Sequence, residues 1–102
     1  MDAGVARVPP EVEAAVKQAI GSNNHAEGAF LLAAIANRAT AALHQVARGE
    51  ASARKGQPEW GRWASLVNAS RDAVLRTATC RQAANQLVQL ERGKSSGAET
   101  NA

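Results

Sequence analysis

Two long stretches of the chain repeat their apolar residues at the spacing of an α-helix. They run over residues 24–54 and 58–92, and a short break containing Gly56 and Pro58 separates them. Glycine and proline are the residues that most often end or restart a helix. A short link between two helices of similar length makes them antiparallel neighbours. The pattern therefore predicts an all-α fold built on an antiparallel hairpin of two long helices.

A shorter apolar stripe precedes the hairpin. Val12 and Val16 lie four residues apart, just after Pro9 and Pro10. Proline is tolerated in the first turn of a helix, and Gly21 is suited to the position after its end. We therefore expect a short N-terminal helix over about residues 10–20.

The ends of the chain have no helical pattern. Residues 1–8 are expected to form a flexible arm. Residues 94–102, which follow a predicted helix stop at Gly93, are polar and are expected to form a disordered tail. A single helical domain is predicted between them, over residues 9–93.

The first long stretch carries its apolar residues in alternating steps of four and three. This is the heptad spacing of helices that pack along a common seam. The second stretch also carries apolar residues on one side of its predicted helix, among them Val74 and Leu87. We expect the following residues to form the core of the hairpin, or a surface through which two copies associate: Leu32, Ala36, Ala39, Leu43, Val46, Val74 and Leu87.

The composition gives a lone hairpin little apolar area to bury. Of the 102 residues, 24 are alanine and only three are aromatic. Small side chains bury little area, and burial stabilises by roughly 25 cal/mol per Å² of apolar surface. We therefore expect a homodimer, in which two hairpins complete a helical bundle.

The break between the two stretches gathers the residues that point most clearly to a partner. Trp60 and Trp63 follow it, and basic residues surround it: Arg54, Lys55 and Arg62. One interpretation is that the tryptophans close the end of the hairpin against Ala42 and Val46. The other is that they anchor a partner, because tryptophan is enriched at the energetic centres of interfaces.

Signatures of catalysis or of metal binding are missing from the sequence. No histidine, cysteine or carboxylate pair has ligand spacing on a helix, and no glycine-rich phosphate loop occurs. We expect neither a cofactor nor an enzymatic activity. Cys80 is the only cysteine, so an intramolecular disulfide is excluded. We expect Cys80 to be a small core residue.

Two family resemblances are partial. The segment from Leu43 to Gly49 resembles the histidine phosphotransfer signature around His44, but its basic residue and glycine are each one place late. One place rotates a side chain by ~100° on a helix. A helical hairpin with tryptophan at its bend is similar to the WXG-type secretion substrates. In this chain Trp60 and Gly61 are adjacent, whereas that motif has a residue between them.

The net charge of the chain is compatible with a second class of partner, a nucleic acid. The net charge is +3, and residues 31–102 carry +5 of it against −2 for residues 1–30. Basic residues near the bend suit a nucleic acid as well as an acidic protein. No stretch is long and apolar enough for a membrane span or a signal peptide, so we expect a cytoplasmic protein. The sequence favours a non-catalytic protein–protein interaction module, and an accessory nucleic-acid-binding protein is the alternative.

Overall fold

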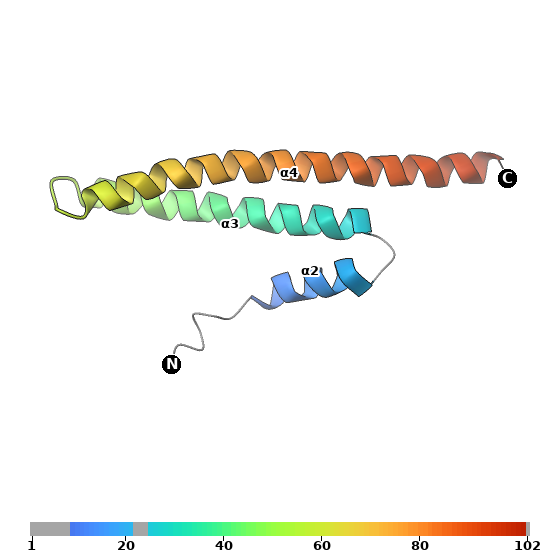
Figure 1. Cartoon of the computed structure of the whole chain (residues 1–102), viewed down its shortest axis with the longest axis horizontal. Helices are drawn as coiled ribbons and strands as arrows, with labels where there is room; N and C mark the ends of the chain where they lie inside the picture. The colour runs from blue at the N-terminus through green and yellow to red at the C-terminus, as the bar shows by residue number, and fades with distance from the viewer. Residues whose placement is uncertain (1–8, 22–24, 102) are drawn as a thin grey trace. The chain divides into compact units, whose positions relative to one another are not determined.

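The computed structural model describes residues 9–21 and 25–101, without the side chains of Ala19, Ile20 and residues 95–101. Within these ranges the structure holds three helices and no strand (Figure 1). They are α2 (Pro10–Gly21), α3 (His25–Ala53) and α4 (Trp60–Asn101). The all-α class and the hairpin of two long helices are confirmed. The predicted arm over residues 1–8 lies outside the described residues.

The start of α2 follows the predicted proline pattern. Pro9 O accepts hydrogen bonds from the backbone nitrogens of Val12 and Glu13, at 3.0 and 3.1 Å. Glu11 and Glu13 lie in the first turn, where a negative charge is favourable next to the helix dipole. The helix buries Ala15, which is 1% exposed.

The link between α3 and α4 depends on one glycine. Gly56 has a φ of 83°, a left-handed conformation that side chains rarely adopt. On either side of Gly56, the backbone nitrogen of Gln57 bonds to Arg54 O and that of Trp60 bonds to Gln57 O, at 3.0 and 3.1 Å. Together these features reverse the chain within a few residues. As a result α4 begins at Trp60, two residues later than Pro58, where the sequence predicts its start.

The other end of α4 differs from the prediction. The sequence predicts an end near Arg92 with Gly93 as the stop, and the structure carries the helix on to Asn101. The predicted stop is the left-handed cap that glycine favours, but Gly56 is the only glycine with a positive φ in the described ranges. Residues 94–101 are therefore helical here instead of forming the predicted tail. Ala102 lies outside the described residues.

The chain divides into two compact units. One consists of residues 33–83, and the other joins residues 1–32 to residues 84–102. In the second unit, Arg92 Nη2 of α4 lies 3.1 Å from Glu27 Oε1 of α3. The single domain predicted over residues 9–93 stays a prediction.

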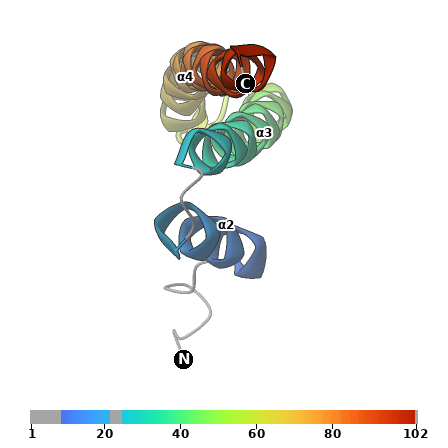
Figure 2. The same ribbon diagram turned by 90° about the vertical axis from the view of Figure 1, so that its right-hand side faces the viewer.

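Within residues 33–83, α3 and α4 lie side by side (Figures 1 and 2) and are joined by polar side chains. Asn37 Nδ2 donates to Val74 O at 3.2 Å and to Thr77 Oγ1 at 3.1 Å. Thr40 Oγ1 lies 3.0 Å from Thr77 Oγ1. One turn further on, His44 Nδ1 lies 3.0 Å from Ser70 Oγ. The hairpin is therefore held by hydrogen bonds between helices as well as by apolar contact.

These contacts define the side of α3 that faces α4. We call it the contact seam, and it consists of Asn37, Thr40, His44, Ala47 and Ala51. Ala47 and Ala51 are buried, at 0% and 9% exposure. The contact seam has the predicted heptad spacing, but it lies one residue later than the predicted stripe. One residue is a rotation of ~100° about the helix axis.

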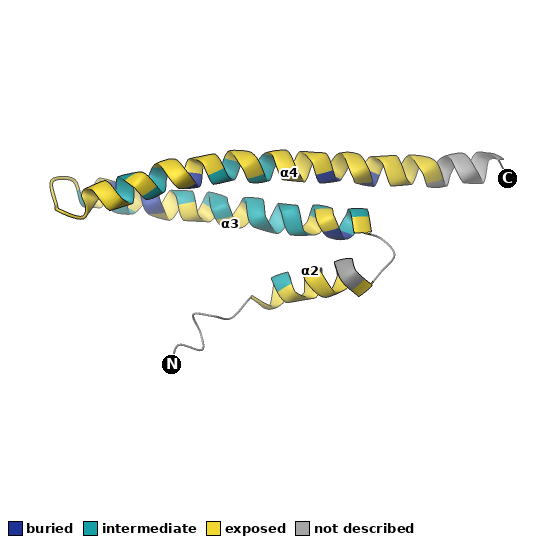
Figure 3. Cartoon of the chain, in the orientation of Figure 1, coloured by how far each residue is buried: buried dark blue, intermediate teal, exposed yellow. Residues whose placement is uncertain are grey.

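As a prediction of the core, the apolar stripe is wrong at four positions, which are exposed: Ala39, Leu43, Val46 and Leu87. Leu32, Ala36 and Val74 are half-buried. Cys80, expected in the core, is exposed as well. On α4 the buried residues are Ser70, Ala84 and Val88 (Figure 3). The stripe remains a prediction as a surface for self-association.

Small side chains explain why the polar side is the buried one. Alanine, serine and threonine allow helix axes to approach closely, which leucine at the same positions would prevent. The hydroxyl groups are also satisfied locally: Ser70 Oγ donates to Val67 O at 3.1 Å, and Thr77 Oγ1 lies 2.8 Å from Ala73 O. Among the described residues, no buried side-chain nitrogen or oxygen lacks a partner. Burial of these groups therefore avoids the cost of an unmade hydrogen bond.

Ser70→Leu tests the close approach of the helices. Ser70 is 1% exposed, so a leucine has no space there, and we expect the free energy of unfolding to fall by about 1–3 kcal/mol. Ser65→Leu is the matched control, because Ser65 is exposed on the same helix. Urea unfolding followed by circular dichroism at 222 nm measures both variants. Equal midpoints for the two variants would contradict the contact seam.

The two glycines near the bend are expected to respond to alanine with opposite signs. Gly56→Ala forces a side chain into a left-handed conformation and should destabilise by roughly 1 kcal/mol. Gly49→Ala should stabilise by up to ~1 kcal/mol, because Gly49 lies within α3 with open space around it. Thermal unfolding of the two variants checks the signs. Stabilisation by Gly56→Ala would show that the turn has another conformation.

Candidate partner-binding site at the hairpin bend

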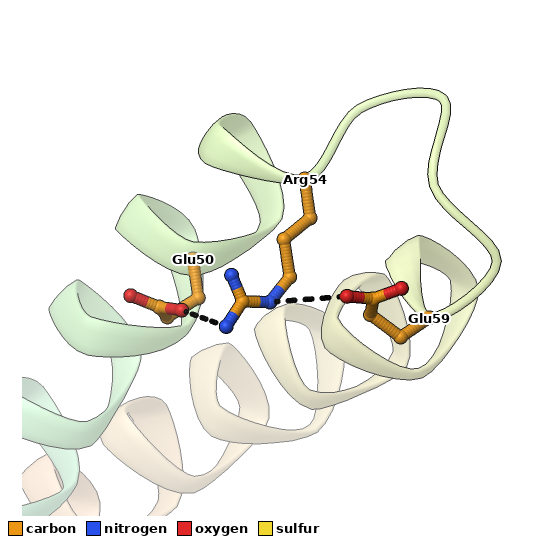
Figure 4. A network of polar contacts seen from close by, with 3 residues as sticks. All are labelled: Glu50, Arg54 and Glu59. Carbon is orange, nitrogen blue, oxygen red and sulfur yellow. Dashed lines mark ion pairs between the residues drawn. The ribbon is translucent and has the colours of Figure 1, made fainter.

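Arg54 occupies the centre of the bend, between two glutamates (Figure 4). Its Nη2 lies 3.0 Å from Glu50 Oε1, one helical turn earlier. Its Nε lies 3.6 Å from Glu59 Oε2, just before α4 begins. These side chains are between one third and one half exposed, so each pair stabilises modestly. Their main effect is geometric: one guanidinium connects the end of α3 to the start of α4.

The same guanidinium lies over an indole ring. The central carbon of the Arg54 guanidinium is 5.6 Å from the centroid of the Trp63 ring. At this distance the cation is attracted by the negative face of the ring. Trp63 is half-buried. Arg54 and Trp63, both predicted to bind a partner, are therefore engaged with each other inside the hairpin.

An open pocket of about 350 Å³ lies at the bend, within the unit of residues 33–83. Its walls come from the last turns of α3, the turn and the first turns of α4. We call it the bend pocket, and it is lined by Arg48, Ala51, Ser52, Lys55, Trp60, Ala64, Val67 and Asn68.

The bend pocket is positively charged. Arg48 and Lys55 line it, and no acidic residue does. Neither cation has an ion pair within the described residues. The nearest acids in sequence are Glu50 and Glu59, and both are paired with Arg54. Arg54 therefore leaves the charges of Arg48 and Lys55 available to a ligand.

The five predicted partner-binding residues are separated by the structure. Trp60 and Lys55 line the bend pocket, and Trp60 is 42% exposed. Arg62 is exposed and lies outside the lining. Arg54 and Trp63 hold the bend together. Whether any of the five binds a partner stays a prediction.

Arg48 also lines the pocket, although it is not one of the five predicted partner-binding residues. The signal for it was its spacing: it precedes Ala51 and Ser52 by three and four residues on α3, which brings the three residues to one face of the helix. Ala64 and Val67 follow Trp60 by four and seven residues in the same way. The predicted closure of the end against Val46 is wrong, because Val46 is 57% exposed.

A second exposed feature is the predicted apolar stripe of α3. Leu43 and Val46 are 42% and 57% exposed, and Ala39 precedes them at helical spacing. We call these three residues the outer stripe. It is exposed because His44 and Ala47, the next residues along the chain, face α4.

The structure also bears on metal binding, on His44 and on membrane insertion. Among the described residues, no group of three or more His, Cys, Asp or Glu is placed to hold a metal ion. His44 is half-buried and bonded to Ser70. Within the same ranges, no helix combines the length and the apolar character needed to cross a membrane.

Comparison with known proteins does not identify the chain. No protein-family model, no curated protein and no solved structure matches it. The class that the fold defines is an all-α helical hairpin. Its exposed surfaces are therefore the features that bear on function.

Arg54→Met tests the role of Arg54 in the bend. It removes two ion pairs and the contact with Trp63, and we expect a loss of roughly 1 kcal/mol of stability at low salt. At ~1 M salt the loss should shrink, because exposed ion pairs are screened. Urea unfolding at both salt concentrations provides the measurement. Arg62→Met is the control, and an equal loss in that variant would contradict a specific role for Arg54.

Proposed function

We propose that this protein is a small, non-catalytic helical module that binds a protein partner through a helix face. Adaptors, inhibitors and secreted substrates are modules of this type. The observation that carries the proposal is the reversed distribution of side chains. Small and hydrogen-bonded residues fill the contact seam, while Leu43 and Val46 are exposed.

The exposed residues are costly in an isolated hairpin. Single exposed apolar side chains are common in proteins and carry no meaning alone. In the outer stripe, however, three apolar residues lie in steps of four and three on one helix. Covering them would stabilise a complex by roughly 25 cal/mol per Å² of apolar surface. Apolar surface grouped in this way is typical of interaction sites.

A second copy of the chain is one partner that this proposal includes. The sequence leads us to expect a homodimer, and a symmetric dimer pairs the same face of both subunits. Two outer stripes in contact would complete a four-helix bundle. In this proposal the protein acts in the cytoplasm, as its sequence leads us to expect.

Accessory nucleic-acid binding is the second candidate. It is favoured by the charge of residues 33–83, which hold eight Lys and Arg against three Asp and Glu. Two of those three acids, Glu50 and Glu59, are paired with Arg54. A surface with so few free acids attracts polyanions. Phosphate contacts of this kind weaken steeply as salt is raised.

Photo-crosslinking in cells of the native host tests the proposal. A photoreactive phenylalanine derivative is placed at Val46, in the outer stripe, or at Gln45, which is exposed on the same helix. We expect an adduct with protein from position 46 that is much weaker from position 45. Mass spectrometry then distinguishes a different protein from a second copy of this chain.

Each outcome decides between the candidates. An adduct with a protein at position 46 supports the interaction module, and an adduct of two copies assigns the outer stripe to the dimer. Equal adducts at both positions contradict a defined face. Adducts with nucleic acid instead of protein support the second candidate and overturn the first.

A further inference from the structure

We propose that the bend pocket binds an acidic peptide segment of a partner protein, in which a glutamate or aspartate lies next to an apolar residue. The proposal rests on the proposed function, because it takes the ligand to be part of a protein. It adds the site and the chemistry of the bound segment. Both follow from the residues that line the pocket.

The charge of the pocket selects an anion. Arg48 lines the pocket from α3, before the last turn of that helix, and Lys55 lines it from the turn that follows. Neither forms an ion pair within the described residues, and Glu50 and Glu59 are held by Arg54. A carboxylate between these cations would gain charge-assisted hydrogen bonds. Ser52 and Asn68, also in the lining, add polar groups.

The remaining walls select an apolar group beside that anion. Ala51, Ala64 and Val67 are aliphatic, and Trp60 adds an indole that is 42% exposed. A volume of about 350 Å³ lies at the small end of ligand sites, which measure roughly 300–1,000 Å³. Such a space suits one or two side chains of a peptide and not a large cofactor.

A peptide fits these walls better than a nucleic acid does. Proteins bind single strands by stacking successive bases on several aromatic rings along a basic groove. The lining of the bend pocket contains a single ring, Trp60, together with three aliphatic residues and two cations. This combination matches the alternation of carboxylate and aliphatic groups in an acidic peptide. Nucleic acid is kept as an outcome of the test.

The test uses Trp60 as the reporter. In the Trp63→Phe variant of the full chain, Trp60 is the only tryptophan, and its fluorescence reports on the pocket that it lines. The probe is the capped peptide Gly-Glu-Leu-Glu-Gly, titrated at low salt. Two further peptides, with glutamine in place of glutamate or serine in place of leucine, separate the charge from the apolar group. A short oligothymidine tests phosphate.

Two double variants with the same change in net charge provide the control. Arg48→Gln with Lys55→Gln removes the cations of the bend pocket. Arg38→Gln with Arg71→Gln removes two exposed cations of the same unit that lie outside the lining. We expect the first pair to weaken peptide binding by about five- to ten-fold, as the loss of two exposed ion pairs allows, and the second by less than about two-fold.

Each result supports or overturns the proposal. Weaker binding of both substituted peptides, with loss confined to the Arg48 and Lys55 pair, supports it. The absence of saturable binding, or equal loss in both double variants, overturns it. Tighter binding of oligothymidine, lost with the same pair, overturns it in favour of a phosphate site.

The result is independent of the crosslinking at Val46. A protein adduct at Val46 together with a pocket that does not bind the peptide would leave the interaction module standing and remove the acidic ligand. The reverse result would remove the outer stripe and keep the pocket as the binding site.

Discussion

The packing of α3 against α4 over residues 33–83 depends on hydrogen bonds between small polar side chains. Asn37 and Thr40 meet Thr77, and His44 meets Ser70. Such side chains allow the helices to approach, and the hydroxyls of Ser70 and Thr77 donate to carbonyls of their own helix. The contact therefore avoids unsatisfied groups, whose burial would be costly. It gains less from apolar burial than a leucine-rich contact would.

The packing of the contact seam against α4 determines which residues of α3 are exposed. Since the heptad spacing admits one face against α4, placing Thr40, His44 and Ala47 there turns Leu43 and Val46 outward. The apolar surface of Leu43 and Val46 is thereby left exposed. The contact seam and the outer stripe are thus two different sets of residues on α3, of which the first packs against α4 and the second is exposed.

At the bend, too, one residue stabilises the fold and its neighbours are exposed. Arg54 binds both glutamates of the region and covers Trp63. Arg48 and Lys55 consequently form no ion pair with the described residues, and both line the pocket with the half-exposed ring of Trp60. One arginine fixes the turn, and its neighbours supply the charge of the pocket. The bend pocket and the outer stripe are distinct surfaces, and each can be changed by mutation without the other.

The sequence by itself determined the order of the helices, the hairpin and the place of the bend, because these follow from local spacing and from Gly56 and Pro58. It also identified Trp60 and Lys55 as neighbours near that bend. It did not determine the end of α4, which continues past Gly93. Only the tertiary structure decided which face of α3 is buried, since two stripes one residue apart have the same heptad spacing. The number of apolar residues predicts that the face with Leu43 and Val46 is buried, whereas in the structure the face with His44 and Ala47 packs against α4. The pairing of Arg54 with Glu59 and the gathering of Arg48 with Trp60 likewise required the fold, because those contacts join residues across the turn.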